Sequence, residues 1–149
     1  MHYDDPQRRP QLKPEAIWEI EHGLRLSAAD VYSASQTRSR WYQQMLALFE
    51  RHDFLALPSA QVFPFDAEQP WPKTIAGREM DSYHRWMEVT AAVTLSGCPA
   101  LSMPAGFDPR GLPMGIQLVA PPRDEHSLLR LAHAYEQQTS WVKRRPPLP

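Results

Sequence analysis

Two neighbouring stretches decide the fold, residues 97–107 (GCPALSMPAGF) and residues 111–121 (GLPMGIQLVAP). Each contains a short apolar run, over residues 100–105 in the first stretch and residues 114–120 in the second, and such runs predict strands. The connecting residues 106–113 include Asp, Pro and Gly, which are typical of turns. The sequence therefore predicts a β-hairpin in this part of the chain.

Regular elements are expected on both sides of this hairpin. A helix over residues 124–139 follows it, because Asp124 is a good N-cap and apolar residues recur there at helical spacing. Ahead of the hairpin, a helical pattern covers residues 79–95. A proline-rich loop over residues 59–78 precedes that helix, and a short apolar strand over residues 53–58 precedes the loop.

The N-terminal part is expected to contain an arm and two helices. Prolines interrupt residues 1–13, which predicts an extended arm. A helix over residues 14–22 begins at a proline, and Gly23 is expected to end it in the left-handed conformation. A long amphipathic helix over residues 27–51 follows, with Ser27 as its N-cap.

These elements predict an α/β (or α+β) fold in which about four helices cover a small mixed sheet that includes the C-terminal β-hairpin. The length of 149 residues is typical of a single domain. The tail over residues 141–149 (WVKRRPPLP) is proline-rich, so no helix is expected there. Phe63 and Phe65, in the proline-rich loop, are expected to be largely buried, on this chain or on a neighbour.

Composition and charge argue against several classes of function. With 16 Lys+Arg against 17 Asp+Glu, the net charge is −1, so binding to nucleic acid or to an anionic membrane is not expected. No apolar run reaches about 18 residues, so no membrane-spanning helix is expected. The N-terminus lacks the apolar core of a signal peptide, and Cys98 is the single cysteine, so we expect a cytoplasmic protein.

Standard patterns for a metal, a nucleotide or a catalytic serine are absent from the sequence. The histidines are scattered and no HExxH occurs, so neither a metal nor a cofactor is expected. There is no glycine-rich phosphate loop and no G-x-S-x-G nucleophile elbow. Cys98 follows a predicted helix without a basic neighbour, which favours a buried hydrophobic side chain over a reactive thiolate.

Four residues are candidates for a binding site. Tyr83, Trp86 and Met87 lie at helical spacing, which is typical of core packing and compatible with a ligand pocket. Gln117 lies within an apolar strand, where an unpaired amide would cost roughly 1–3 kcal/mol, so we expect it to be buried and hydrogen-bonded. The sequence leaves open whether Gln117 braces the structure or contacts a substrate.

The two deciding stretches resemble the C-terminal signature of the amidase signature family. That signature reads G-x-P-A-hydrophobic-S-hydrophobic-P-A-G-F, a turn, and then G-L-P-hydrophobic-G-hydrophobic-Q-hydrophobic. Residues 125–136 (EHSLLRLAHAYE) look like the closing helix of the family, and residues 53–59 (DFLALPS) look like its D-x-L-x-x-P strand. Arg38 and its helix also fit, so the resemblance covers most of residues 12–145.

The resemblance also implies what this chain lacks. Members of the family hydrolyse amides with a Ser–cis-Ser–Lys triad, whose serines belong to a Gly/Ser-rich stretch that does not occur here. The only lysines, Lys13, Lys73 and Lys143, are in no matching context. The chain therefore looks like the last third of a family member, with no catalytic residue of its own and no expected amidase activity in isolation.

In the family, this last third supplies strands to one edge of a mixed sheet, covering helices and part of the substrate-pocket wall. The resemblance thus makes Tyr83, Trp86, Met87 and Gln117 candidates for that wall, with a small amide as substrate of the complete enzyme. Alternatives are a non-enzymatic binding or scaffold module and a subunit that completes a split amidase or an amidotransferase-like enzyme. The expected partner is a second copy of the chain or an N-terminal amidase portion.

Overall fold

The computed structural model describes residues 2–144 and consists of two compact units. The first unit ends at Ser39 and the second begins at Arg40, so each is described by itself. The prediction of a single domain stays a prediction. Among the described residues, no helix is both long and apolar enough to cross a membrane.

The first unit begins with turns that fold back on a helix. The 3-10 helix η1 (Arg9–Gln11) precedes the α-helix α1 (Pro14–Gly23). Glu21 of α1 accepts hydrogen bonds from the Tyr3 hydroxyl at 3.2 Å and from the Arg9 guanidinium at 2.9 Å. The prediction of an extended arm over residues 1–13 is therefore wrong for its described part, because local turns and Glu21 give its polar groups partners.

The boundary between α1 and the next helix, α2 (Ala28–Phe49), is only partly as predicted. Gly23 belongs to α1 and has no positive φ, so the predicted left-handed stop is wrong. The N-terminus of α2 has the predicted cap: the Asp30 N–H donates to Ser27 Oγ at 3.2 Å. The Ser27 N–H donates in return to the Asp30 carboxylate at 2.8 Å, a reciprocal arrangement that satisfies two helix-end donors.

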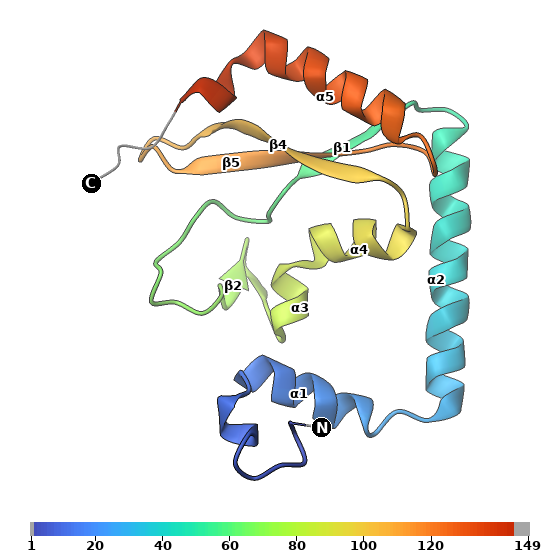
Figure 1. Ribbon diagram of the computed structural model, residues 1–149, viewed down its shortest axis with the longest axis vertical. Coiled ribbons are helices and arrows are strands. Elements are labelled where there is room, and N and C mark those ends of the chain that lie inside the picture. The colour runs from blue at the N-terminus through green and yellow to red at the C-terminus, as the bar shows by residue number, and fades with distance from the viewer. Residues whose placement is uncertain (1, 145–149) are drawn as a thin grey trace. The chain divides into compact units, whose positions relative to one another are not determined.

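The second unit is built on a three-stranded antiparallel sheet (Figure 1). Its strands are β1 (Leu55–Pro58), β4 (Ala100–Phe107) and β5 (Pro113–Val119), in the order β1-β5-β4. The predicted hairpin is confirmed as β4 and β5, and the predicted short strand as β1. The sheet was expected to be mixed, but its pairs within the described residues are antiparallel because β5 runs opposite to both neighbours.

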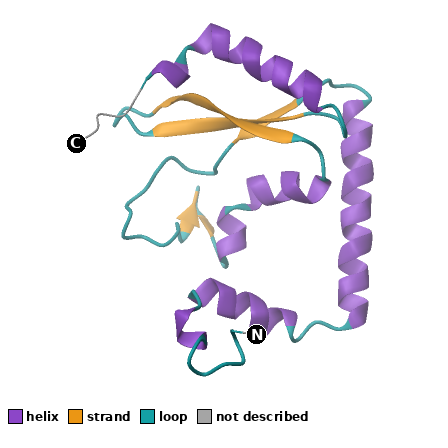
Figure 2. Cartoon of the chain, in the orientation of Figure 1, coloured by secondary structure: helices purple, strands orange, loops and turns teal. Residues whose placement is uncertain are grey.

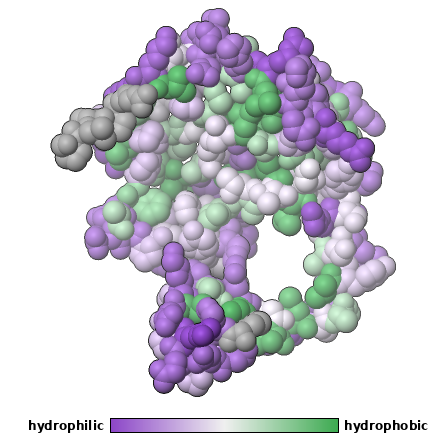
Figure 3. Space-filling model, in the orientation of Figure 1, coloured by the Kyte–Doolittle hydropathy of each residue, from purple (hydrophilic) through white to green (hydrophobic). Residues whose placement is uncertain are grey.

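One face of the sheet is covered by α5 (Glu125–Thr139), as Figure 1 shows. Leu118 of β5 and Leu128 of α5 are both buried in one hydrophobic cluster. The predicted N-cap is confirmed, since the Asp124 carboxylate accepts the N–H of Ser127 at 3.4 Å. Hydrophilic residues cover the outer side of this helix (Figure 3), so α5 is amphipathic in the predicted sense.

The opposite face packs against α4 (Glu88–Ser96) and the C-terminal part of α2. Val119 of β5 is fully buried and clusters with Met45 of α2 and Val93 of α4. Cys98 belongs to the same cluster at 9% exposure, which confirms its hydrophobic role. Successive residues of β5 therefore supply two separate clusters, because side chains alternate across a strand.

The predicted helix over residues 79–95 is wrong in its first part. Residues 79–82 are not helical, the single turn α3 (Tyr83–Trp86) follows, and α4 begins only after Met87. Met87 interrupts the helix with φ −104° and ψ 8°. At the other end, Gly97 ends α4 in the left-handed conformation with φ 69°, which a glycine adopts without strain.

A long loop joins β1 to a small hairpin that the sequence did not predict (Figure 2). The hairpin pairs β2 (Thr74–Ile75) with β3 (Arg78–Glu79). Its turn residues, Ala76 and Gly77, have φ values of 49° and 79°. Two consecutive positive φ values are typical of a tight two-residue hairpin turn. The sequence did not indicate this turn, because alanine, which stands at position 76, rarely adopts a positive φ.

The C-terminal tail contains a short helix against expectation. The 3-10 helix η2 (Trp141–Lys143) follows α5. Its Trp141 ring packs edge-on against Phe107 of β4, with centroids 6.0 Å apart, and the Arg144 guanidinium lies 3.9 Å from the Phe107 centroid. These contacts to β4 explain the turn. The prediction for residues 145–149 lies outside the described residues.

Candidate substrate-pocket wall

Gln117 links three elements of the second unit. Its side chain projects from β5 and is 6% exposed. The amide nitrogen donates to the carbonyl of Pro58 in β1 at 2.9 Å and to the carbonyl of Val89 in α4 at 3.1 Å. The prediction of a buried, hydrogen-bonded amide is confirmed. Gln117 thus links β1, an edge strand of the sheet, to α4, which packs against one face of the sheet.

The two residues that Gln117 bonds also line a depression of about 400 Å³. Its other walls come from the loop after β1 and from the β2–β3 hairpin. Its lining combines polar and apolar side chains, among them Pro58, Gln61, Ile75, Arg78, Glu88 and Val89. Gln117 is not itself part of the lining, but its hydrogen bonds to Pro58 and Val89 position two of the residues that line the depression.

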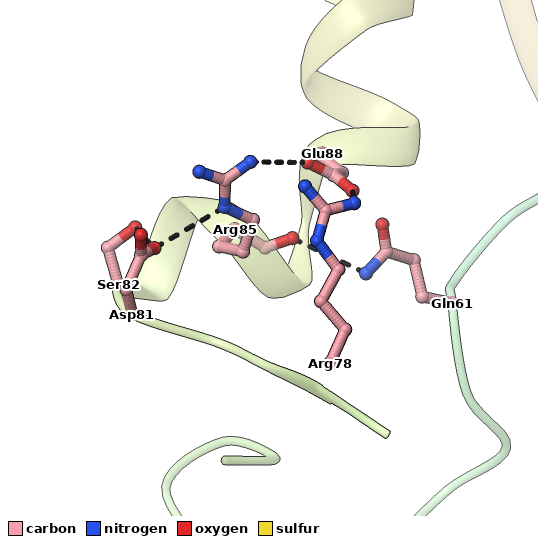
Figure 4. A network of polar contacts seen from close by, with 6 residues as sticks. All are labelled: Gln61, Arg78, Asp81, Ser82, Arg85 and Glu88. Carbon is pink, nitrogen blue, oxygen red and sulfur yellow. Dashed lines mark hydrogen bonds and ion pairs between the residues drawn. The ribbon is translucent and has the colours of Figure 1, made fainter. Parts of the chain in front are cut away.

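A network of charged side chains lies at the depression (Figure 4). The Glu88 carboxylate pairs with Arg78 at 3.5 Å and with Arg85 at 3.4 Å. Arg85 also donates to the Asp81 carboxylate at 3.4 Å. The Gln61 amide nitrogen donates to the Arg85 carbonyl at 3.3 Å, which ties the loop after β1 to α3.

The contact between Asp81 and Arg85 stabilises the charged forms of these two residues. The hydrogen bond from Arg85 is the main cause that lowers the pKa of Asp81 below its ordinary value. The same hydrogen bond to Asp81 raises the pKa of Arg85. Both groups therefore remain ionised throughout the neutral range, and the cluster keeps its alternating charges.

The three aromatic and sulfur candidates lie next to the depression rather than in its lining. Trp86 packs edge-on against Phe65, with centroids 5.8 Å apart, and against Tyr83, with centroids 5.9 Å apart. Its indole Nε1 is buried and has no hydrogen-bond partner among the described residues. Met87 joins α3 to α4. A role of Tyr83, Trp86, Met87 and Gln117 in a pocket wall stays a prediction.

The proline-rich loop is less buried than predicted. Phe63 is 41% exposed and Phe65 is 36% exposed, so the prediction that this chain largely buries them is wrong. Their burial against a neighbouring chain stays a prediction. The loop is held instead by the contact between Phe65 and Trp86 and by Arg110, whose guanidinium donates to the Pro64 carbonyl at 3.2 Å.

Sequence reasoning missed the charged network, although a signal was present. Arg78, Asp81, Arg85 and Glu88 alternate in sign at spacings of three, four and three residues. Such spacing favours ion pairs along a helix, and here it connects a hairpin to two short helices. The misplaced helix boundary hid the network, because the helix was predicted to begin at residue 79, whereas Glu79 forms a strand with Arg78.

Two serine hydroxyls meet at β4 and at the end of β1. The hydroxyls of Ser59 and Ser102 lie 2.7 Å apart, and Gly115 leaves room for them. The Lys73 ammonium lies 3.3 Å from the centroid of the Trp71 ring. Within residues 2–144, no three His, Cys, Asp or Glu side chains gather closely enough to hold a metal ion. The expectation that this chain contributes no catalytic residue stays a prediction.

Comparison with known proteins places this architecture in a family. A family model described as Amidase matches residues 3–129. The chain belongs to the amidase family. It is 32% identical over 145 residues to the amidase-family protein AmiD of Mycobacterium tuberculosis, covering 96% of this chain and 30% of AmiD. It is 38% identical over 142 residues to a glutamyl-tRNA(Gln) amidotransferase subunit of Synechococcus sp. (strain JA-3-3Ab), covering 91% of this chain and 26% of that protein.

Solved structures of amidase-family proteins share the fold. A bacterial aryl acylamidase superposes with a TM-score of 0.81 at 24% identity, covering 95% of this chain and 31% of that enzyme. A protein from a vestigial complex, described with the evolutionary origins of an s-triazine catabolic enzyme, superposes with a TM-score of 0.79 at 25% identity. The superposition covers 93% of this chain and 30% of that protein. The amidase resemblance and the fold class are thereby confirmed, and the chain spans about 30% of these relatives.

Proposed function

We propose that this chain forms one wall of the substrate cleft of an amidase, and that residues outside this sequence supply the catalytic groups. The observation that carries the proposal is the depression whose walls are joined by Gln117. Membership of the amidase family supports it, as does the sequence, which contains no Gly/Ser-rich stretch for the family's serines.

The complete enzyme would hydrolyse the C–N bond of a carboxamide. A base-activated nucleophile would form an acyl-enzyme, and backbone N–H groups would hold the tetrahedral oxyanion. The part of this chain in that reaction would be to position the amide substrate beside the nucleophile. Holding a substrate in reacting geometry is by itself a large contribution to the rate.

The open edges of the sheet are the proposed contacts to the catalytic portion. Within the described residues, β1 and β4 form the two edges of the three-stranded sheet. On β4, the side chains of Ala100, Ser102 and Pro104 are exposed. Exposed strand edges recruit further strands, which supports pairing with a catalytic portion of the same polypeptide or of a separate chain.

A second candidate, a non-enzymatic binding module or one component of a larger assembly, is supported by the same open edges. One relative is named as a subunit of an amidotransferase, and another comes from a protein complex. In this alternative, the edge strands would bind a partner without any chemistry. A cytoplasmic location and a homo-oligomer remain proposals as well.

The decisive experiment reconstitutes the enzyme. Purified chain alone should show no turnover of simple amides or esters above background. Coexpression with the part of AmiD that this chain does not match should yield a complex that hydrolyses amides. A complex that forms and remains inactive would favour the binding module. Turnover by the purified chain that disappears on mutation of one of its own residues would contradict the proposal.

A further inference from the structure

The depression beside Gln117 contains one cation whose donors are largely unused. Arg78 of β3 lines it, and among the described residues its ion pair is a single contact of 3.5 Å to one oxygen of Glu88. A guanidinium carries five N–H donors in a planar fork that matches a carboxylate. Since the Arg78 side chain is 64% exposed, its remaining donors are available to a ligand.

Glu88 has a second cationic partner besides Arg78. Arg85 donates to the other carboxylate oxygen of Glu88 at 3.4 Å, and Asp81 holds Arg85 from the opposite side, also at 3.4 Å (Figure 4). These three residues are spaced i, i+4 and i, i+3 around α3, which keeps them together. When Arg78 turns toward a ligand, Glu88 therefore stays paired with Arg85.

The rest of the lining is suited to a short carbon chain. Ile75, Met80 and Val89 line the same depression and offer apolar surface. Gln61 also lines it and carries an amide group. A ligand with a carboxylate at one end, an aliphatic chain, and a carboxamide at the other would match these surfaces in charge and polarity.

We propose that Arg78 binds the carboxylate of substrates that are monoamides of short aliphatic dicarboxylic acids. The inference rests on the proposed function, because it names the substrate class of the same site. Arg78 acts as a specificity residue, and the amide end of the ligand is left for the catalytic groups.

The test measures binding to the full chain and needs no activity. Succinamate is the probe and succinamide its neutral control, because the two differ only in one carboxylate. In an NMR titration, succinamate should shift the Arg78 side-chain signal and the backbone signals of the lining residues. Succinamide should bind at least about tenfold more weakly than succinamate. Arg78→Ala should remove this preference, and Arg78→Lys should restore part of it, since a lysine keeps the charge without the fork.

Arg51→Ala is the matched control, because it removes an exposed arginine from the end of α2, away from the lining. It should leave succinamate binding unchanged. Equal affinity for both probes, no binding of succinamate at millimolar concentration, or an unchanged preference in Arg78→Ala would each overturn the inference.

The reconstituted enzyme separates this inference from the proposed function. There, Arg78→Ala should raise KM for succinamate at least about tenfold more than it raises KM for succinamide. If no amide is hydrolysed but the chain still binds succinamate through Arg78, the proposed function fails and only the carboxylate-binding role of Arg78 holds. If amides are hydrolysed with no preference for succinamate, the function holds and the inference fails.

Discussion

At the scale of single residues, Gln117 joins β1 to α4 at the depression. Gln117→Leu keeps the side-chain volume but leaves the carbonyls of Pro58 and Val89 without their donor. We expect a loss of roughly 1–3 kcal/mol of unfolding free energy, because buried acceptors lose their partners. Chemical denaturation measures this loss, and an unchanged midpoint would show that the two bonds contribute nothing.

Gly115 is a second residue whose identity the packing dictates. A Cβ at this position would lie 2.7 Å from Ser59 Oγ and 3.0 Å from Ser59 Cβ. Gly115→Ala should therefore destabilise the chain by about 1–3 kcal/mol, since the Ser59–Ser102 hydrogen bond must break and β1 must shift. Gly23→Ala is the control: nothing lies within 4 Å of a Cβ there. It should be neutral or stabilise the chain by up to about 1 kcal/mol, as denaturation of both variants would show.

At the scale of elements, one aromatic contact helps to hold the loop between β1 and β2, beside the hydrogen bonds of Gln61 and Arg110. Phe65 packs edge-on against Trp86, whereas Phe63 is 41% exposed. Aromatic pairs of this kind contribute about 0.5–1.5 kcal/mol beyond their burial, so Phe65→Ala should raise the rate of native-state proteolysis in the loop several-fold. Phe63→Ala is the control and should change that rate little. Equal rates in both variants would contradict this role of Phe65.

At the scale of the whole molecule, the open sheet edges predict self-association when no catalytic portion is present. Light scattering over a concentration series should show a homodimer or a higher oligomer, and a monomer at high micromolar concentration would refute the argument. Ala100→Lys, on the exposed face of β4, should shift the equilibrium toward monomer, because a charged edge strand disfavours pairing. Ala47→Lys, at an exposed position of α2, is the control and should leave it unchanged.

The sequence by itself determined the local elements and the family. The hairpin of β4 and β5, helix α5 with Asp124 as its cap, and the buried Gln117 all follow from apolar patterns and cap residues within a few positions of one another. Such signals are local, so they survive without knowledge of the tertiary contacts. The family signature lies in the same segments, and residues 3–129 match the family.

Only the tertiary structure decided how the candidate site is assembled. The partners of Gln117 are 59 and 28 residues away along the chain, and no local pattern specifies them. Likewise, Glu79 leaves the predicted helix because it pairs with Thr74 in a strand, and this pairing outweighs helical propensity. That pairing places Arg78 outside any helix, and its contact to Glu88 of α4 then forms between two separate elements, which the sequence pattern alone does not specify.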